Sequence, residues 1–149
     1  MSAPRAPGNA PRALGSARPI VLVEDDDDHA ELTELALRRA RVPGRVVRAR
    51  TGAAALELIC GDGPKRLPEP PALVLLDLRL PDLDGRTVLE RLRVADGAAS
   101  LRVVVLTASH PDDVPALEGV EALLTKPVRP GVLAELAQRL GMGSAEAGA

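Results

Sequence analysis

The sequence predicts a single α/β domain with a doubly wound parallel sheet of five strands in the order 2-1-3-4-5. Two observations favour this fold class. Short apolar runs alternate with helix-like segments five times, and four of the runs end at a charged or hydroxyl side chain. Strands that alternate with helices form parallel sheets with right-handed crossovers and helices on both faces. Five such units are most often wound in this order, which places the first strand beside the third.

The composition fits one domain and excludes several classes of protein. The chain has 149 residues, a net charge of −2 and 0% aromatic residues, so its core must consist of Leu, Val, Ile and Ala. The charge gives no reason to expect nucleic-acid binding, and no apolar run approaches the ~18 residues of a membrane helix. Cys60, the only cysteine, is interpreted as an inert helix-end residue, and a chain without disulfides fits a reducing cytoplasm. We expect disordered tails at 1–18 and 142–149 around a domain at 19–141.

A run of five acids separates the first strand from the first helix. Residues 19–23 are apolar, and the acids occupy 24–28. Asp26 or Asp27 can cap a helix over 27–41, and acids in its first turn suit the helix dipole. The apolar side chains that have helical spacing here, and that we expect to face the core, are Leu32, Leu35 and Ala36.

The second unit begins after a turn at Pro43-Gly44. A strand at 45–49 leads to a helix at 52–60. The loop at 61–71 contains four prolines, and its polar composition predicts that it is exposed. The side chains of this helix that should face inward are Leu56 and Ile59.

The third strand is an apolar run at 72–76 that stops at Asp77, as expected for a strand buried on both faces. Pro81 prevents the strand from continuing, and Asp84 can cap a helix over 85–94. The side chains that this helix should bury are Val88, Leu89 and Leu92.

The last two units are less regular. A strand at 101–106 ends at Thr107, and a strand at 122–125 ends at Lys126. Between 109 and 120 there is room for only a short fourth helix, interrupted by Pro115 near its start. A fifth helix is expected at 130–140, because Pro130 suits a first helical turn.

The predicted strand order brings several charges to one edge of the sheet. Glu24, Asp25 and Asp77 would meet at the switch point, with Thr107 and Lys126 on the other side of the third strand. At ~4 Å and an effective dielectric of ~20, each pair of like charges costs about 4 kcal/mol. Such a cluster suits a bound cation, and hard oxygen ligands favour Mg²⁺. Lys126 and Thr107 could then contact a phosphoryl group, which indicates phosphoryl transfer.

Four motifs occur in order, VLVEDD, LLDLRLPDLDG, VVVLTAS and LLTKPV. Over about residues 18–140 the chain therefore resembles a bacterial two-component response regulator receiver domain, whose fold is flavodoxin-like. It is most similar to the stand-alone receivers that are paired with phytochrome-type histidine kinases. That similarity lies in the VEDDDDHAELT start, the proline-rich loop and the DLRLPDLDGRTVL segment.

The resemblance implies a function as a phosphoacceptor. Asp77 would accept a phosphoryl group from the phosphohistidine of a sensor histidine kinase, and Thr107 and Lys126 would contact that group. No enzymatic activity beyond this autophosphotransfer and autodephosphorylation is implied, and the location would be cytoplasmic. The expected Mg²⁺ ligands are Asp25, Asp77, the backbone carbonyl of Arg79 and, through water, Glu24. The Lys126-Pro127 bond is expected to be cis.

Two departures from the family pattern affect signalling. Leu123 stands where the family has a switch aromatic, and the interval from Thr107 to Lys126 is about one helical turn short. The face made by the fourth helix, fifth strand and fifth helix should therefore signal weakly or differently. Homodimerisation through that face, which is common in the family, remains an expectation. We expect no output domain after the fifth helix, and therefore expect the protein to act by docking, dimerising or passing phosphate onward.

Two alternatives were weighed. Asp82-Leu83-Asp84-Gly85 resembles the nucleophile motif of haloacid-dehalogenase-type phosphatases, but that motif needs the first Asp at a strand end and a Thr directly after the Gly. The second alternative is an interaction module that phosphorylation does not regulate. We interpret Asp26, Asp27 and Asp28 as helix caps or solvated surface. His29 and His110 lack the spacing of metal ligands, and we expect both to be exposed.

Overall fold

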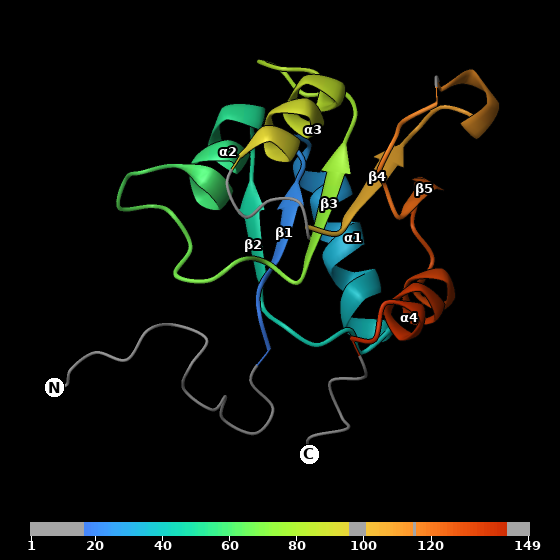
Figure 1. The fold of residues 1–149 in the computed structure, drawn as a ribbon. Coiled ribbons are helices and arrows are strands. Elements are labelled where there is room, and N and C mark those ends of the chain that lie inside the picture. Colours follow the sequence, from blue (N-terminus) through green and yellow to red (C-terminus); the bar gives the residue numbers. More distant parts are fainter. Residues whose placement is uncertain (1–16, 96–100, 115, 143–149) are drawn as a thin grey trace, which may run out of the picture.

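The sheet has the predicted topology. The computed structural model describes residues 17–95, 101–114 and 116–142 (Figure 1). Its five strands are all parallel and lie in the order β2-β1-β3-β4-β5. The predicted tails fall outside the described residues, apart from residues 17, 18 and 142. The strands are β1 (Ile20–Val23), β2 (Val46–Ala49), β3 (Leu73–Asp77), β4 (Val103–Thr107) and β5 (Ala122–Thr125).

Helices cover both faces of the sheet, as doubly wound folds require. In Figure 1, α2 and α3 lie on one face and α1 and α4 on the other. The core accordingly has two halves: Leu22 and Leu75 point to the α1 and α4 side, and Val23 and Leu76 to the α2 and α3 side. The helices in the described ranges are α1 (Asp27–Arg39), α2 (Gly52–Cys60), α3 (Gly85–Val94), α4 (Pro130–Arg139) and the 3-10 helix η2 (Pro111–Asp113). None of the described helices is long and apolar enough to cross a membrane.

The helix starts follow from local sequence. Asp26 accepts a hydrogen bond from the His29 backbone N–H at 2.9 Å and caps α1, and Asp84 does the same for α3 through the Thr87 N–H at 2.8 Å. Pro130 is the first residue of α4, as predicted.

One prediction about helix orientation was wrong. Leu32 is 52% exposed instead of facing the core. Ala36 is buried as predicted and Leu35 is half-buried. The buried side of α1 is the one that packs against α4 and against the β1 and β3 residues of the core. Its residues are Ala30, Thr33, Ala36 and Leu37. The predicted inward residues of α3, namely Val88, Leu89 and Leu92, are all buried.

The segment before β5 also differs from the prediction. Within the described residues, a single 3-10 turn, η2, takes the place of the expected short fourth helix, and Pro115 lies outside the described ranges. An i→i+3 turn is the regular structure that fits so short an interval. Leu123 on β5 is half-buried and packs against the α2 and α3 side of the core.

Candidate functional site

Four strands end level with one another at one edge of the sheet. The register pairs Val23 with Leu76, Asp77 with Leu106 and Thr107 with Thr125. Because the strands are parallel, residues that end or directly follow them meet at this edge. The structure thereby brings together all five side chains that the sequence singled out at strand ends: Glu24, Asp25, Asp77, Thr107 and Lys126.

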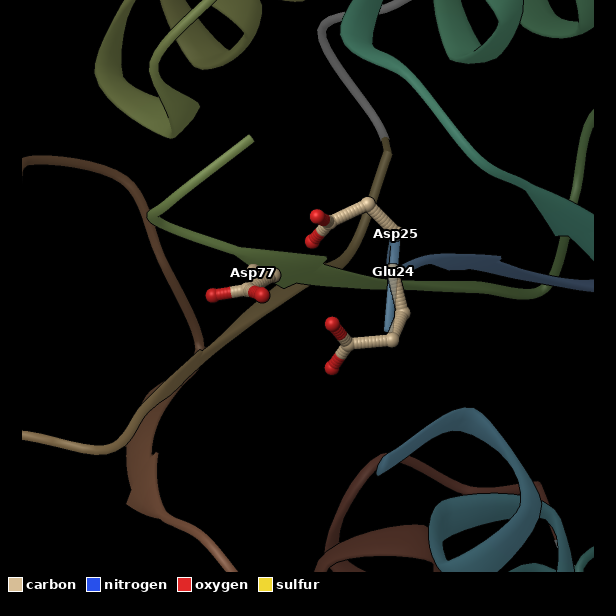
Figure 2. A group of neighbouring side chains, drawn as sticks. All are labelled: Glu24, Asp25 and Asp77. Atoms are coloured by element: carbon tan, nitrogen blue, oxygen red, sulfur yellow. The ribbon is translucent and has the colours of Figure 1, made fainter. Parts of the chain in front are cut away.

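Three of these side chains form an acidic cluster. Glu24, Asp25 and Asp77 each offer a carboxylate oxygen, and the three oxygens lie within 4.8 Å of one another. In Figure 2, Glu24 and Asp25 leave the end of β1 on opposite sides and turn their carboxylates toward the side of Asp77. Glu24 is fully buried and Asp77 nearly so, whereas Asp25 is exposed. A set of hard oxygen donors open to solvent on one side fits Mg²⁺, which keeps several waters.

Lys126 lies between the two buried carboxylates. Its Nζ donates to Glu24 Oε1 at 2.5 Å and to Asp77 Oδ2 at 3.0 Å. Burial alone would lower the pKa of Lys126, but the hydrogen bonds to the two carboxylates outweigh it and raise that pKa. Burial raises the pKa of Glu24, and the Lys126 hydrogen bond offsets this only in part. The ammonium group thus offsets part of the negative charge of the cluster.

Thr107 is placed to donate a hydrogen bond. Its hydroxyl is buried at the end of β4, and Oγ1 accepts from the Ser109 backbone N–H at 3.0 Å. Because the oxygen accepts from Ser109, the hydroxyl hydrogen remains available to donate to a further partner. The structure thus places a carboxylate, an ammonium and a hydroxyl at one edge of the sheet.

The chain turns away tightly after Asp77. Asp77 Oδ1 accepts from the Arg79 backbone N–H at 3.1 Å, and the Gly85 N–H donates to the Leu78 carbonyl at 2.8 Å. A Cβ atom at Gly85 would lie 2.7 Å from the Asp77 carbonyl oxygen. Glycine is therefore required at the start of α3 for the helix to approach the strand end this closely. The side chain of Arg79 is exposed.

Several contacts were missed by the sequence reasoning. Asp27 was interpreted as solvated surface, but its Oδ1 pairs with both Arg48 Nη1 and Arg50 Nη1 at 2.7 Å, and the Arg48 hydrogen bond lowers its pKa. The predicted strand order places β2 beside β1 and so brings basic residues near the acidic run, but it does not give the side-chain directions that decide which of them pair with Asp27. His29 is 46% exposed, as expected, yet its Nδ1 lies 3.3 Å from Lys126 Nζ.

Asp82 has a structural role that the sequence did not indicate. Its two carboxylate oxygens accept from the backbone N–H groups of Gly52 and Ala53, each at 2.9 Å, and these bonds lower its pKa. Asp82 therefore caps the start of α2. It follows β3 by five residues, so it does not hold the strand-end position that the phosphatase alternative requires.

The fold and the site together define a class of protein: a doubly wound α/β domain with an acidic cluster, a hydroxyl and a lysine at its strand ends, as in receiver domains. The family model described as "Response regulator receiver domain" matches residues 20–138. The chain belongs to this family, and it is homologous to phytochrome response regulators.

Three relatives illustrate the similarity. The bacteriophytochrome response regulator AtBRR is 40% identical with a TM-score of 0.73, over 85% of this chain and 94% of AtBRR. The Mn²⁺-bound form of response regulator Rcp1 is 33% identical with a TM-score of 0.66, over 83% of this chain and 91% of that one. The phosphorylated cyanobacterial phytochrome response regulator RcpA is 30% identical with a TM-score of 0.65, over 83% and 90%.

The sequence matches to the first curated relatives cover less of this chain than the structural matches do. Response regulator Rcp1 of Synechocystis sp. is 35% identical over 94 residues, which are 63% of this chain and 64% of Rcp1. The chain spans 60% and 64% of the length of the first curated relatives that it matches.

Proposed function

We propose that this protein is the phosphoacceptor of a two-component phosphorelay, which receives a phosphoryl group from a sensor histidine kinase on Asp77 in a Mg²⁺-dependent reaction. One observation carries the proposal. The nearly buried carboxylate of Asp77 lies at the strand-end edge of a receiver fold, beside Glu24, Asp25 and Lys126. The solved structure of phosphorylated RcpA, a relative, supports the same chemistry.

The transfer needs one nucleophile and a held geometry. A carboxylate oxygen of Asp77 attacks the phosphorus of the donor phosphohistidine, the new O–P bond forms as the N–P bond breaks, and the electron pair of that bond returns to the imidazole. The bond from the Arg79 N–H to Oδ1 holds the carboxylate of Asp77, and the close approach of Gly85 to the Asp77 carbonyl holds the backbone at the end of β3. Such positioning accounts for most of the catalysis in phosphoryl transfer.

The remaining requirement is to offset the negative charge that the phosphoryl group brings. The ammonium of Lys126 can move from the Glu24 and Asp77 carboxylates to a phosphoryl oxygen, and the Thr107 hydroxyl can donate to another. Glu24, Asp25, Asp77 and the Arg79 carbonyl are the groups that would hold Mg²⁺. The ion, when bound, supplies the positive charge that lets an anionic donor approach three carboxylates.

The cognate kinase in this proposal is a phytochrome-type histidine kinase. The names of AtBRR and RcpA, which associate those proteins with bacteriophytochrome and phytochrome, support it. The proposal also includes a single domain at 19–141, a cytoplasmic location, no enzymatic activity beyond self-phosphorylation and dephosphorylation, and homodimerisation through the η2, β5 and α4 face. The presence of every acceptor-site residue favours this function over an interaction module that is not phosphorylated.

The test is phosphorylation by acetyl phosphate, followed by intact mass. With Mg²⁺ the wild-type protein should gain one phosphoryl group, and EDTA should prevent the gain. Asp77→Asn should abolish it, whereas the matched variant Asp82→Asn should be labelled like wild type. Undiminished labelling of Asp77→Asn would overturn the assignment.

A further inference from the structure

We propose that Arg48 is a positioning residue for the metal site, and that it sets the affinity for a divalent cation by holding the acidic loop, residues 24–28, in shape. The inference rests on the proposed function, because the metal site serves phosphoryl transfer, but its test measures metal binding alone. Arg48 lies on β2 and offers no ligand atom. It acts instead through its hydrogen bonds to the acidic loop.

Arg48 reaches the acidic loop at two points. Its Nε donates to the backbone carbonyl of Glu24 at 3.0 Å, and its Nη1 donates to Asp27 Oδ1 at 2.7 Å. The next residue, Ala49, accepts the Glu24 backbone N–H through its carbonyl at 3.0 Å. Both backbone groups of Glu24 are therefore held by consecutive residues of β2. Asp25, the exposed ligand of the cluster, lies between the two points that Arg48 fixes.

The strand places Arg48 where it can do this. Side chains alternate along a strand, so Arg48 lies on the same face as Val46, which packs on the α1 side of the core. Its register partner is Leu22, two residues before Glu24. The stem of Arg48 thus runs over the end of β1 toward α1, and only 19% of the side chain is exposed.

The orientation of Arg48 toward the loop leaves one of its three guanidinium nitrogens without a hydrogen bond in the described part of the chain. Its third nitrogen, Nη2, is buried and has no hydrogen-bond partner among the described residues. A buried donor of a charged group without a partner is unfavourable and calls for an explanation. The explanation that we infer is the hold on the loop: when Nε and Nη1 bond the loop, Nη2 faces no acceptor that the structure describes.

Two effects of removing Arg48 on metal binding have opposite signs, so a measurement can separate them. An arginine near a cation site repels the incoming ion, so its removal should tighten binding if electrostatics were its only effect. Loss of the loop geometry should weaken binding, because groups that orient metal ligands typically contribute 10–100-fold to affinity. Arg50 provides the matched control: it pairs with the same Asp27 oxygen, is 63% exposed, and has no bond to the Glu24 backbone within the described structure.

The experiment is a titration with Mn²⁺ alone, in which free Mn²⁺ is followed by electron paramagnetic resonance. Arg48→Met should weaken Mn²⁺ binding by about tenfold or more. Arg50→Met should change it by less than about fivefold, as for an exposed ion pair. Circular dichroism at the titration temperature establishes that each variant is folded, so a merely structural role would lower the melting temperature and leave the affinity of the folded protein unchanged.

If Arg48→Met does not fold, Arg48→Lys replaces it, because lysine keeps the charge but donates from a single nitrogen and lacks the rigid planar fork with which Arg48 spans the Glu24 carbonyl and Asp27. Arg48→Lys should then bind Mn²⁺ more weakly than Arg50→Met does. Wild-type or tighter Mn²⁺ affinity in the folded Arg48 variant overturns the proposal. Failure of the proposed function would be recognised separately, as absence of acetyl phosphate labelling in a wild-type protein that still binds Mn²⁺.

Discussion

Lys126 is the residue on which the charge balance of the strand-end edge depends. Without it, the carboxylates of Glu24 and Asp77 would face each other with side-chain exposures of 0% and 8% and no cation between them. Removing one partner of a buried ion pair destabilises a protein by about 3–5 kcal/mol, because a charge is left unpaired. The same residue thus has a structural role in the metal-free protein and a proposed role in binding phosphate.

We predict that Lys126→Met lowers the melting temperature in EDTA by about 6–12 °C, which corresponds to about 3 kcal/mol in a domain of this size. The chain has no aromatic residues, so melting must be followed by far-UV circular dichroism or calorimetry. Combining the change with Glu24→Gln should recover part of the loss, because it removes one of the two facing charges. A Lys126→Met protein as stable as wild type would contradict this account of the site.

At the residue scale, the sequence located the strand-end groups but not all of their partners. Asp77 and Thr107 could be placed because each ends an apolar run, and parallel strands align those ends. The pairing of Asp27 with Arg48 could not be assigned from spacing, because it depends on side-chain direction at the end of β2. Leu32 was misplaced for a related reason: helical spacing defines a stripe but not which side meets the core.

At the scale of elements, the loop between β3 and α3 is fastened to α2. Asp82 in this loop accepts the first N–H groups of α2, thirty residues earlier in the chain, at Gly52 and Ala53. A carboxylate there satisfies otherwise unpaired N–H groups and interacts favourably with the helix dipole. The loop that follows Asp77 is thereby anchored to the start of α2.

We predict that Asp82→Ala lowers the melting temperature by a few degrees at pH 7, through the lost cap. Because bonds from Ala53 and Gly52 lower the folded-state pKa of Asp82 below its ordinary 3.8, the stabilisation is fully present above that value. It is lost as the pH falls through the folded-state pKa. The difference between wild type and variant should therefore shrink in strong acid. Asp62→Ala, in the exposed loop after α2, is the matched control and should leave the melting temperature at pH 7 close to that of wild type.

The segment between β4 and β5 contains the part of the fold that the sequence anticipated least well. A short helix was expected, and the described residues hold only the 3-10 turn η2. The interval was recognised as short, but its local structure depends on how Leu117 and Val120 pack against the core. Because Leu123 stands in place of an aromatic, we expect any change on phosphorylation to be carried by Thr107 and the residues that follow it.

We predict that amide hydrogen exchange, compared with and without beryllofluoride and Mg²⁺, changes most over residues 107–113. The reason is that the Thr107 hydroxyl would turn to the bound group and alter its bond with the Ser109 N–H. Mass spectrometry of peptides from this segment measures the effect. A larger change in α4, with residues 107–113 unaffected, would count against this mechanism.

At the scale of the whole molecule, the topology was predictable because each level of the sequence agrees. Apolar runs, caps such as Asp84 and the alternation of strands with helices all indicate one winding, and β2-β1-β3-β4-β5 is that winding. The boundaries differ by one or two residues, as at β4, which begins at Val103 and includes Thr107. The central claim built on this fold is that Asp77 is the phosphoacceptor.

The most direct test of that claim maps the acyl phosphate to a residue. After acetyl phosphate treatment, borohydride reduces an aspartyl phosphate to homoserine, and trypsin then cleaves the chain after Arg66, Arg79 and Arg86. The peptide 67–79 contains Asp77 as its only aspartate, and the peptide 80–86 contains Asp82 and Asp84. We predict homoserine in the peptide 67–79 and only when Mg²⁺ is present. Homoserine in the peptide 80–86, with 67–79 unmodified, would contradict the assignment of Asp77.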